Sequence, residues 1–186
     1  MIAVAKEKGD FDNLHFIEAD INELSKHFNK EEFDMIFSNF GGLNCLSQQH
    51  LEEFFKNCAP LLSKNGRLVL VIMPRNTLWE QFYFLSKGNF KDIFRRKKRN
   101  LIANVDGESV PTYYYNPEET SQLANSSFNF KNKFPIGFFV PPSYLEPFFK
   151  NKPRLISILS TLESKVPQHQ SLSKYADHYL IVFEKR

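Results

Sequence analysis

The chain has 186 residues with 24 Lys and Arg against 21 Asp and Glu, so it is long enough for one compact domain and its net charge is only +3. Apolar residues make up 42% of the sequence and aromatic residues 15%, which excludes a mainly disordered chain. No apolar run approaches the ~20 residues that cross a bilayer, and the first residues lack a secretory signal, so we expect a soluble, cytoplasmic protein.

Glycine and cysteine usage excludes several kinds of site. The 7 glycines are spaced so that no G-x-G occurs, which excludes both a dinucleotide fingerprint and a P-loop. Cys45 and Cys58 form no C-x-x-C pair and have no histidines at zinc-binding spacing. We therefore interpret both cysteines as packing thiols and predict no metal site.

The first part of the chain predicts two strands and two helices. Residues 1–8 are typical of the end of an amphipathic helix that stops at Gly9. Residues 14–20 and 33–37 predict short strands, the second followed by a turn over 38–42. Ser47 is placed to cap a helix, whose apolar side chains recur at helical spacing at Leu51, Phe54, Phe55, Cys58 and Leu62.

The centre of the fold is predicted at residues 68–73, a continuous apolar run that ends at Pro74. Such a run indicates a strand covered on both faces, as in a parallel sheet between helices. Downstream we predict helices over 77–85, 116–124 and 154–163 and strands over 112–115 and 179–183, whereas 126–153 has no clear period. The alternation of strands and helices favours an α/β protein with a largely parallel sheet, with an antiparallel last strand as an alternative.

In this order, the segments resemble class I S-adenosylmethionine-dependent methyltransferases, specifically their C-terminal two-thirds. Met1 to Lys8 resembles the helix after the ribose-binding acid, and Leu14 to Asp20 the third strand with its closing Asp. Phe33 to Phe40 resembles the fourth strand and its loop, and Leu61 to Leu70 the Leu-Lys-Pro-Gly-Gly turn into the fifth strand. Tyr115 to Glu119 resembles the helix start before the sixth strand, and Ala176 to Lys185 the seventh strand.

The resemblance implies a Rossmann-like sheet that is incomplete. Its first strand, glycine-rich loop and ribose-binding acid would precede the helix in which Met1 lies, so we expect an N-terminally truncated domain over 1–186. The third to seventh strands would remain. Substrate-side insertions follow the fifth strand in this family, which places that region at about 76–140.

The resemblance also implies S-adenosylmethionine as the cofactor and names residues for it. Asp20 would accept a hydrogen bond from the adenine amino group, with the Ile21 amide beside it. Asn39, Phe40 and Gly41 would line the methionine moiety, where glycine permits a close backbone approach. The alternatives are that Asp20 caps a helix over 21–28 and that 39–41 is an ordinary strand-to-helix turn.

The substrate side is less defined. Asn44 would orient a substrate or stabilise its own turn. The basic stretch 87–99 has three interpretations: a solvated helix face, a contact with an anionic substrate or membrane surface, or a nucleic-acid contact, which the net charge of +3 makes the weakest. The five histidines are scattered, so no catalytic residue is assigned. The expected acceptor wall comprises Trp79, Arg95, Arg96, Tyr113 and Tyr114.

Two functions follow. The leading hypothesis is the C-terminal portion of a methyltransferase that acts on a small-molecule or lipid-like acceptor and is weak or inactive alone. The alternative is a non-catalytic α/β binding or assembly module, whose exposed sheet edge would favour a homo-oligomer. A nicotinamide-dependent reductase is disfavoured because the phosphate loop is absent.

Overall fold

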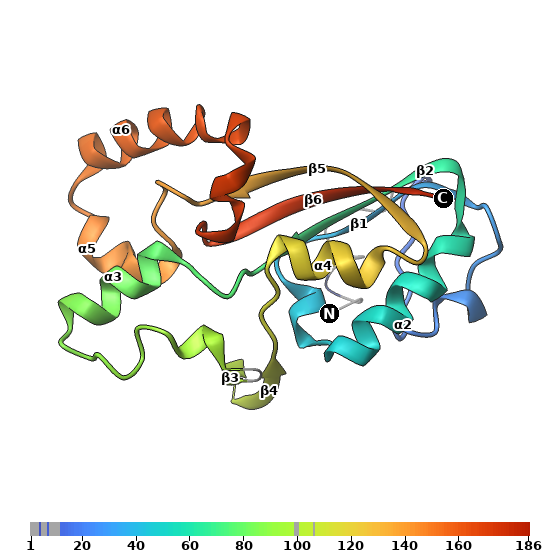
Figure 1. Ribbon diagram of the computed structural model, residues 1–186, viewed down its shortest axis with the longest axis horizontal. Helices are drawn as coiled ribbons and strands as arrows, with labels where there is room; N and C mark the ends of the chain where they lie inside the picture. The colour runs from blue at the N-terminus through green and yellow to red at the C-terminus, as the bar shows by residue number, and fades with distance from the viewer. Residues whose placement is uncertain (1–3, 5–6, 8–11, 99–100, 106) are drawn as a thin grey trace.

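The computed structural model describes residues 4, 7, 12–98, 101–105 and 107–186. Apart from two positions, the helix predicted over residues 1–8 lies outside them. The α/β class is confirmed (Figure 1). The strands are β1 (Phe33–Ser38), β2 (Leu62–Ile72), β3 (Leu101–Val105), β4 (Glu108–Thr112), β5 (Phe128–Ile136) and β6 (His178–Lys185). The α-helices are α2 (Gln48–Cys58), α3 (Leu78–Ser86), α4 (Pro117–Ala124), α5 (Glu146–Phe149) and α6 (Pro153–Glu163).

The main sheet has four strands in the order β1-β2-β6-β5, and β3 and β4 form a separate two-stranded ribbon. β1 and β2 are parallel, whereas β6 runs antiparallel to both β2 and β5. The antiparallel alternative for the last strand is therefore correct. Because β6 is reversed, its first residues lie beside the carboxyl end of β2, with Tyr179 opposite Ile72.

The strand predicted over residues 14–20 is wrong. These residues have no regular secondary structure, and the side chains of Leu14 and Ile17 are exposed. A strand is stable only when a neighbour pairs with its backbone and covers its apolar face, and the sheet ends at β1 instead. The apolar pattern of the segment is real, but within the described residues it does not pair with the sheet.

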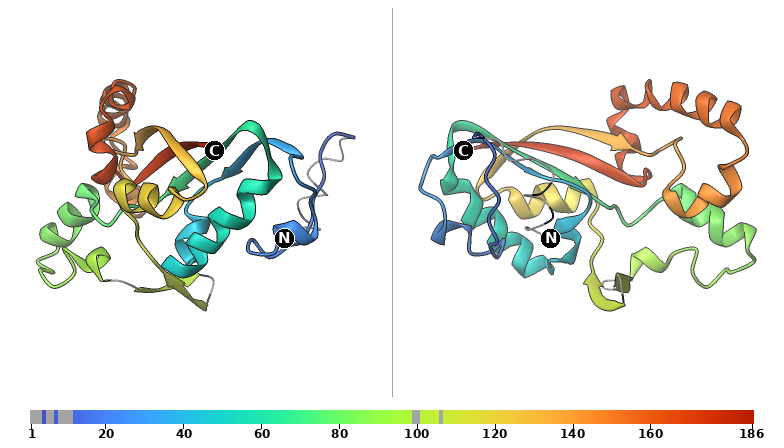
Figure 2. Two further views of the ribbon diagram at one scale, coloured as in Figure 1. Left: turned by 45° about the vertical axis from the view of Figure 1, so that its right-hand side comes forward. Right: turned by 180° about the vertical axis from the view of Figure 1, so that it is seen from behind.

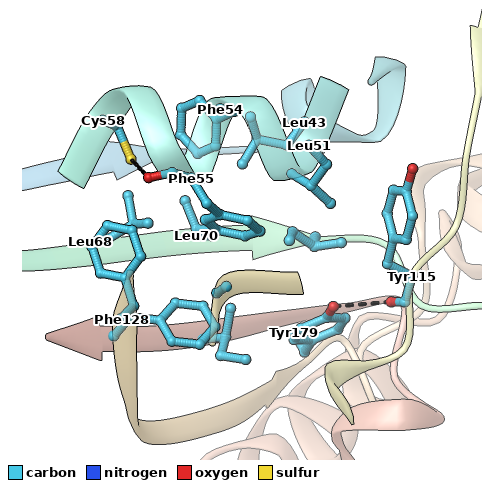
Figure 3. Packing of buried hydrophobic residues seen from close by; sticks show 14 of the residues in the cluster. Leu43, Leu51, Phe54, Phe55, Cys58, Leu68, Leu70, Tyr115, Phe128 and Tyr179 are labelled. Atoms are coloured by element: carbon cyan, nitrogen blue, oxygen red, sulfur yellow. Dashed lines mark hydrogen bonds between the residues drawn. The ribbon is translucent and has the colours of Figure 1, made fainter. Parts of the chain in front are cut away.

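Helices α2 and α4 cover one face of the sheet and build the core (Figures 1 and 3). As predicted, the Ser47 side chain accepts from the His50 N–H to start α2, and Asn116 and Glu119 form a reciprocal capping box at α4. On the buried face of α2, the Phe55 ring makes edge-to-face contacts with Phe128 of β5 and Phe183 of β6. The core is therefore aromatic where the helices meet the two antiparallel strands.

Two further predictions need correction. The strand predicted over 112–115 ends at Thr112, because the Tyr113 and Tyr115 N–H groups donate to Asn44 and Met73 instead of to a neighbouring strand. The stretch 126–153 contains a strand, β5, which its local pattern did not predict, although the family resemblance implied a sixth strand after the helix at 116–124. Its pattern is obscured because it lies at the sheet edge, has a register shift after Phe130 and contains Pro135, a residue tolerated in edge strands.

A second part of the molecule, which we call the helical lobe, is made from two chain segments outside the sheet. It comprises α3, the following 3₁₀ turn at Arg95–Lys97, and α5 and α6 from the segment between β5 and β6. The ring centroids of Trp79 and Phe149 lie 5.8 Å apart, which joins α3 to α5. The ribbons of these two helices lie side by side in Figures 1 and 2. Within the expected insertion range 76–140, α4 and β5 belong to the sheet part. No helix among the described residues is both long and apolar enough to cross a membrane.

Candidate functional site

The turn that follows β1 is strained. Phe40 has a φ of 48° and Gly41 a φ of 68°, so two successive residues adopt the left-handed conformation. For a non-glycine residue this costs roughly 1–2 kcal/mol, and the Phe40 side chain, 81% exposed, recovers none of that by packing. The Asn39 side-chain oxygen accepts the Phe40 N–H at 2.9 Å, and the Gly41 N–H donates to Val71 of β2 at 3.1 Å. The turn is thus held in a costly conformation at the carboxyl end of the parallel pair.

Gly41 is required by its surroundings as well as by its dihedral angle. A Cβ atom there would lie 3.1 Å from the Met73 methyl carbon and 3.2 Å from the Asn44 side-chain oxygen. Glycine therefore lets this turn pack against the end of β2, which is a structural reason independent of any ligand.

Asn44 is fully buried and connects three segments. Its side-chain amide donates to the carbonyls of Tyr113 at 2.6 Å and Met73 at 3.2 Å, and its oxygen accepts the Met73 N–H at 2.9 Å. Both amide hydrogens are used, so the side chain has no donor left for a substrate. These bonds match the turn-stabilising alternative for Asn44.

Asp20 is exposed and starts a local turn. One carboxylate oxygen accepts the Asn22 N–H at 2.8 Å, and the Asp20 carbonyl accepts the Glu23 N–H. The helix predicted over 21–28 is reduced to a 3₁₀ turn at Leu24–Lys26. The capping alternative thus holds for one Asp20 oxygen. The second Asp20 oxygen and the Ile21 backbone N–H form no hydrogen bond within the described residues.

The exposed groups of Asp20, Asn39 and Phe40 are chemically suited to contact S-adenosylmethionine. The free Asp20 oxygen is an acceptor suited to an adenine amino group, and the exposed Asn39 and Phe40 offer an amide and an aromatic face beside the carboxyl end of β1. Asn39, Phe40 and Asp20 would therefore hold the cofactor, and Gly41 would shape the turn that carries Phe40.

The helical lobe contains a buried ionic network that the sequence did not indicate. Glu80 on α3 is buried and accepts from the Arg95 and Arg96 side chains, each at 2.8 Å. Arg96 is 6% exposed, lies 3.5 Å from Asp177 and stacks on the Tyr114 ring. The hydrogen bond with Glu80 raises the pKa of Arg95. The basic stretch is therefore not a solvated helix face at these positions, since its arginines anchor the lobe.

Asp177 and His178 lie where β6 begins, beside the carboxyl end of β2. The His178 Nδ1 atom is 3.0 Å from an Asp177 carboxylate oxygen. Burial would raise the pKa of Asp177, but hydrogen bonds and charges from His178 and Arg96 outweigh it and lower that pKa. Apart from the position of His178 at the start of a predicted strand, no sequence pattern indicated this pair.

The remaining expected acceptor residues fall into two groups. Trp79 lines an apolar cavity in the lobe, and Arg95 lines a second cavity together with Glu80. Tyr114 is buried beneath Arg96, and burial raises the pKa of its hydroxyl. Tyr113 is partly buried and is tied through its backbone to Asn44. In the part of the chain that the structure describes, no group of three or more His, Cys, Asp or Glu side chains could hold a metal ion.

Comparison with known proteins finds a sequence similarity over the first third of the chain and a similarity in fold over nearly all of it. A sequence model of the methyltransferase domain family matches residues 1–66. A protein of Listeria monocytogenes described as an S-adenosylmethionine-dependent methyltransferase aligns with a TM-score of 0.60 and 13% identity, over 100% of this chain and 75% of its own. No curated protein matches the sequence significantly.

Two further structures extend the likeness. A protein of Pyrococcus horikoshii aligns with a TM-score of 0.54 and 15% identity, over 99% of this chain and 63% of its own. A geranyl diphosphate methyltransferase in complex with S-adenosylmethionine aligns with a TM-score of 0.52 and 11% identity, over 99% and 62%. The chain thus spans somewhat less than two thirds of the length of these two proteins and is similar to them in fold.

Proposed function

We infer that this chain, a class I methyltransferase whose cofactor is S-adenosylmethionine, contributes the acceptor side of a methyl-transfer site. The acceptor we propose is a small molecule or a lipid-like compound bound against the helical lobe. The observation that carries the proposal is the strained turn at Phe40, since strain of this kind concentrates at binding and active sites.

Bound S-adenosylmethionine supplies an electrophilic methyl group, which a nucleophile on the acceptor attacks in line. The work of the protein is then to orient the acceptor and to exclude water. Phe40 would shield the cofactor side, and the lobe residues Trp79 and Arg95 would bound the acceptor side. The described residues supply an electrically neutral turn at Asn39 and Phe40, which suits a cationic sulfonium better than a basic surface would.

The lipid-like choice of acceptor rests on the lobe and on one relative. The cavity beside Trp79 is lined mainly by aromatic side chains. Among the similar structures, the geranyl diphosphate methyltransferase is named for an acceptor with an apolar chain and an anionic head. An acceptor of that general character fits an apolar lobe.

Cofactor binding by this chain alone is expected to be weak. No G-x-G loop occurs in the sequence, so this chain has no glycine-rich loop to bind the side of the cofactor opposite Asp20 and Phe40. Isothermal titration should give a Kd above roughly 100 μM, and low-micromolar affinity would contradict this expectation.

A Phe40→Asn variant tests whether the strained turn serves the cofactor. Asparagine tolerates the left-handed conformation, so thermal stability should stay the same or rise, by up to ~1 kcal/mol. Binding of S-adenosylmethionine, measured at millimolar concentrations by ligand-observed NMR, should nevertheless weaken. Unchanged binding would remove Phe40 from the proposed site, and Phe90→Asn, at a ring that is 69% exposed and outside the lobe cavity, is a control for loss of an exposed ring.

The alternative function, an assembly module, is favoured by one observation. β1 is an edge strand, and its Met35 and Phe37 side chains are 59% and 52% exposed on one face. Exposed apolar edge strands pair with other chains. Light scattering should therefore detect a dimer or larger species that a Phe37→Lys variant dissociates, and a sharp monomer peak for the unmodified chain would exclude this alternative.

A further inference from the structure

A cavity of about 350 Å³ lies between α3 and α5, apart from the turn at Phe40. Its volume is at the lower end of the range for ligand pockets, about 300–1,000 Å³. Of the ten lining residues, only Lys87 carries a charge and none is acidic. Six are aromatic: Trp79, Phe82, Tyr83, Tyr144, Phe148 and Phe149.

The walls of this aromatic cavity are braced by edge-to-face ring contacts. Trp79 contacts Phe82 at a centroid distance of 6.4 Å and Phe149 at 5.8 Å, and Tyr83 contacts Tyr144 at 5.4 Å. Phe149 is itself buried, so it fixes one wall against the body of the lobe. Rings held by one another in this way keep a space open without a ligand, as expected of a preformed site.

The rim of the aromatic cavity combines exposed rings with unpaired positive charge. Phe82 and Phe148 are 59% and 58% exposed although both line the cavity. The Lys152 ammonium lies 3.1 Å from the centroid of the Phe148 ring. Neither Lys87 nor Lys152 forms an ion pair with any residue that the structure describes. The rim therefore attracts an anion, while the mainly aromatic interior favours an apolar group.

We propose that the aromatic cavity binds the tail of a single-chain amphiphile whose anionic head is held by Lys87 and Lys152. The volume of about 350 Å³ and the mainly aromatic lining favour a single apolar chain as the occupant, with its charged head at the rim. Identifying this occupant with the methyl acceptor rests on the proposed function, but the binding itself requires neither cofactor nor catalysis.

The chain carries its own reporter for this binding. Trp79 is the sole tryptophan and forms part of the cavity wall. Titration with octanoate, decanoate and dodecanoate, each kept below its micelle concentration, should change the tryptophan emission with 1:1 saturation. Affinity should increase about fourfold for each added methylene until the tail fills the cavity. An emission change that keeps increasing with ligand concentration and never saturates would indicate nonspecific partition and would overturn the proposal.

Two sets of variants locate the tail and the head. Leu145→Phe fills part of the cavity and should reduce decanoate affinity at least tenfold, whereas Leu162→Phe on α6, outside the lining, should leave it unchanged. The double variant Lys87→Met with Lys152→Met should weaken decanoate but not decanol. Circular dichroism establishes that each variant is folded, and a second filling variant, Ser86→Leu, replaces Leu145→Phe if that one is not.

Other results would overturn the proposal. Equal binding by Leu145→Phe and the unmodified chain would exclude the cavity. Binding to phosphatidylserine vesicles that Leu145→Phe leaves intact, together with no binding of monomeric decanoate, would assign the lobe to a membrane surface instead. Saturable decanoate binding, in a chain whose weak S-adenosylmethionine binding is unchanged by Phe40→Asn, would support the cavity and count against the proposed function, so the two failures are distinguishable.

Discussion

The carboxylate of Glu163, at the end of α6, accepts four successive backbone N–H groups. Gly137 and Phe138 donate to one oxygen at 2.8 and 3.2 Å, and Phe139 and Val140 donate to the other at 2.6 and 3.1 Å. Four converging N–H groups form an anion-binding concavity. In this protein the bound anion is its own side chain, which ties α6 to the segment that follows β5.

We predict that Glu163→Gln loosens this segment. Hydrogen bonds to a charged group contribute about 1.5–3 kcal/mol each, but these four share one carboxylate and lie in a partly exposed loop where water replaces lost partners. The glutamine keeps one acceptor oxygen of the same shape and presents an amide donor to the other two N–H groups. The expected cost is about 2 kcal/mol, confined to the lobe.

Amide hydrogen exchange at residues 137–140 measures this cost directly. A local loss of about 2 kcal/mol corresponds to roughly 30-fold faster exchange where these amides exchange by local opening. Glu146→Gln is the matched control, because Glu146 is exposed in the same lobe and its side chain forms no hydrogen bond with the described residues. If Glu163→Gln leaves exchange at residues 137–140 within twofold of the unmodified chain, the carboxylate does not hold the loop.

Four further predictions concern Asn44, Tyr179, the two cysteines and Asp177. Asn44→Ala should cost about 3 kcal/mol or more in urea unfolding, because it leaves buried backbone groups of two segments without partners. Tyr179→Phe should cost about 1–2 kcal/mol, since the hydroxyl bonds to Thr120 and to a backbone carbonyl inside the core; no change in midpoint would mean that water replaces it. Burial raises the pKa of the Cys58 thiol to about 12, so a thiol reagent at pH 8 should modify exposed Cys45 in the folded chain and reach Cys58 only on unfolding. The lowered pKa of Asp177 contributes stability above its unfolded pKa of about 4 that is lost as pH falls through the folded value; Asp177→Asn should flatten the stability profile in that acid range.

Local signals predicted the helices that cover the sheet. Ser47 and Asn116 act as caps because each needs only its neighbours in sequence, and the apolar spacing of α2 follows from one buried face. The run at 68–73 correctly predicted the central strand, although β2 begins earlier, at Leu62. Features that depend only on residues within one or two turns of the chain can therefore be predicted from the sequence.

Features that depend on distant partners were missed. Residues 14–20 have an apolar strand pattern but no paired neighbour, whereas β5 has a weak pattern and gains its structure from β6. The same reason explains Asn44, whose three side-chain bonds join segments 29 and 69 residues away. A single sequence does not encode such pairings in its local spacing.

Buried polar contacts attach the lobe to the sheet at Arg96. Arg96 reaches both Glu80 on α3, 16 residues earlier in the chain, and Asp177 at the start of β6, 81 residues later, so one guanidinium joins two distant segments. Such a connection is directional, because a hydrogen bond weakens steeply when its distance and angle depart from the preferred geometry. It therefore holds the walls of the aromatic cavity in register with the carboxyl end of β2.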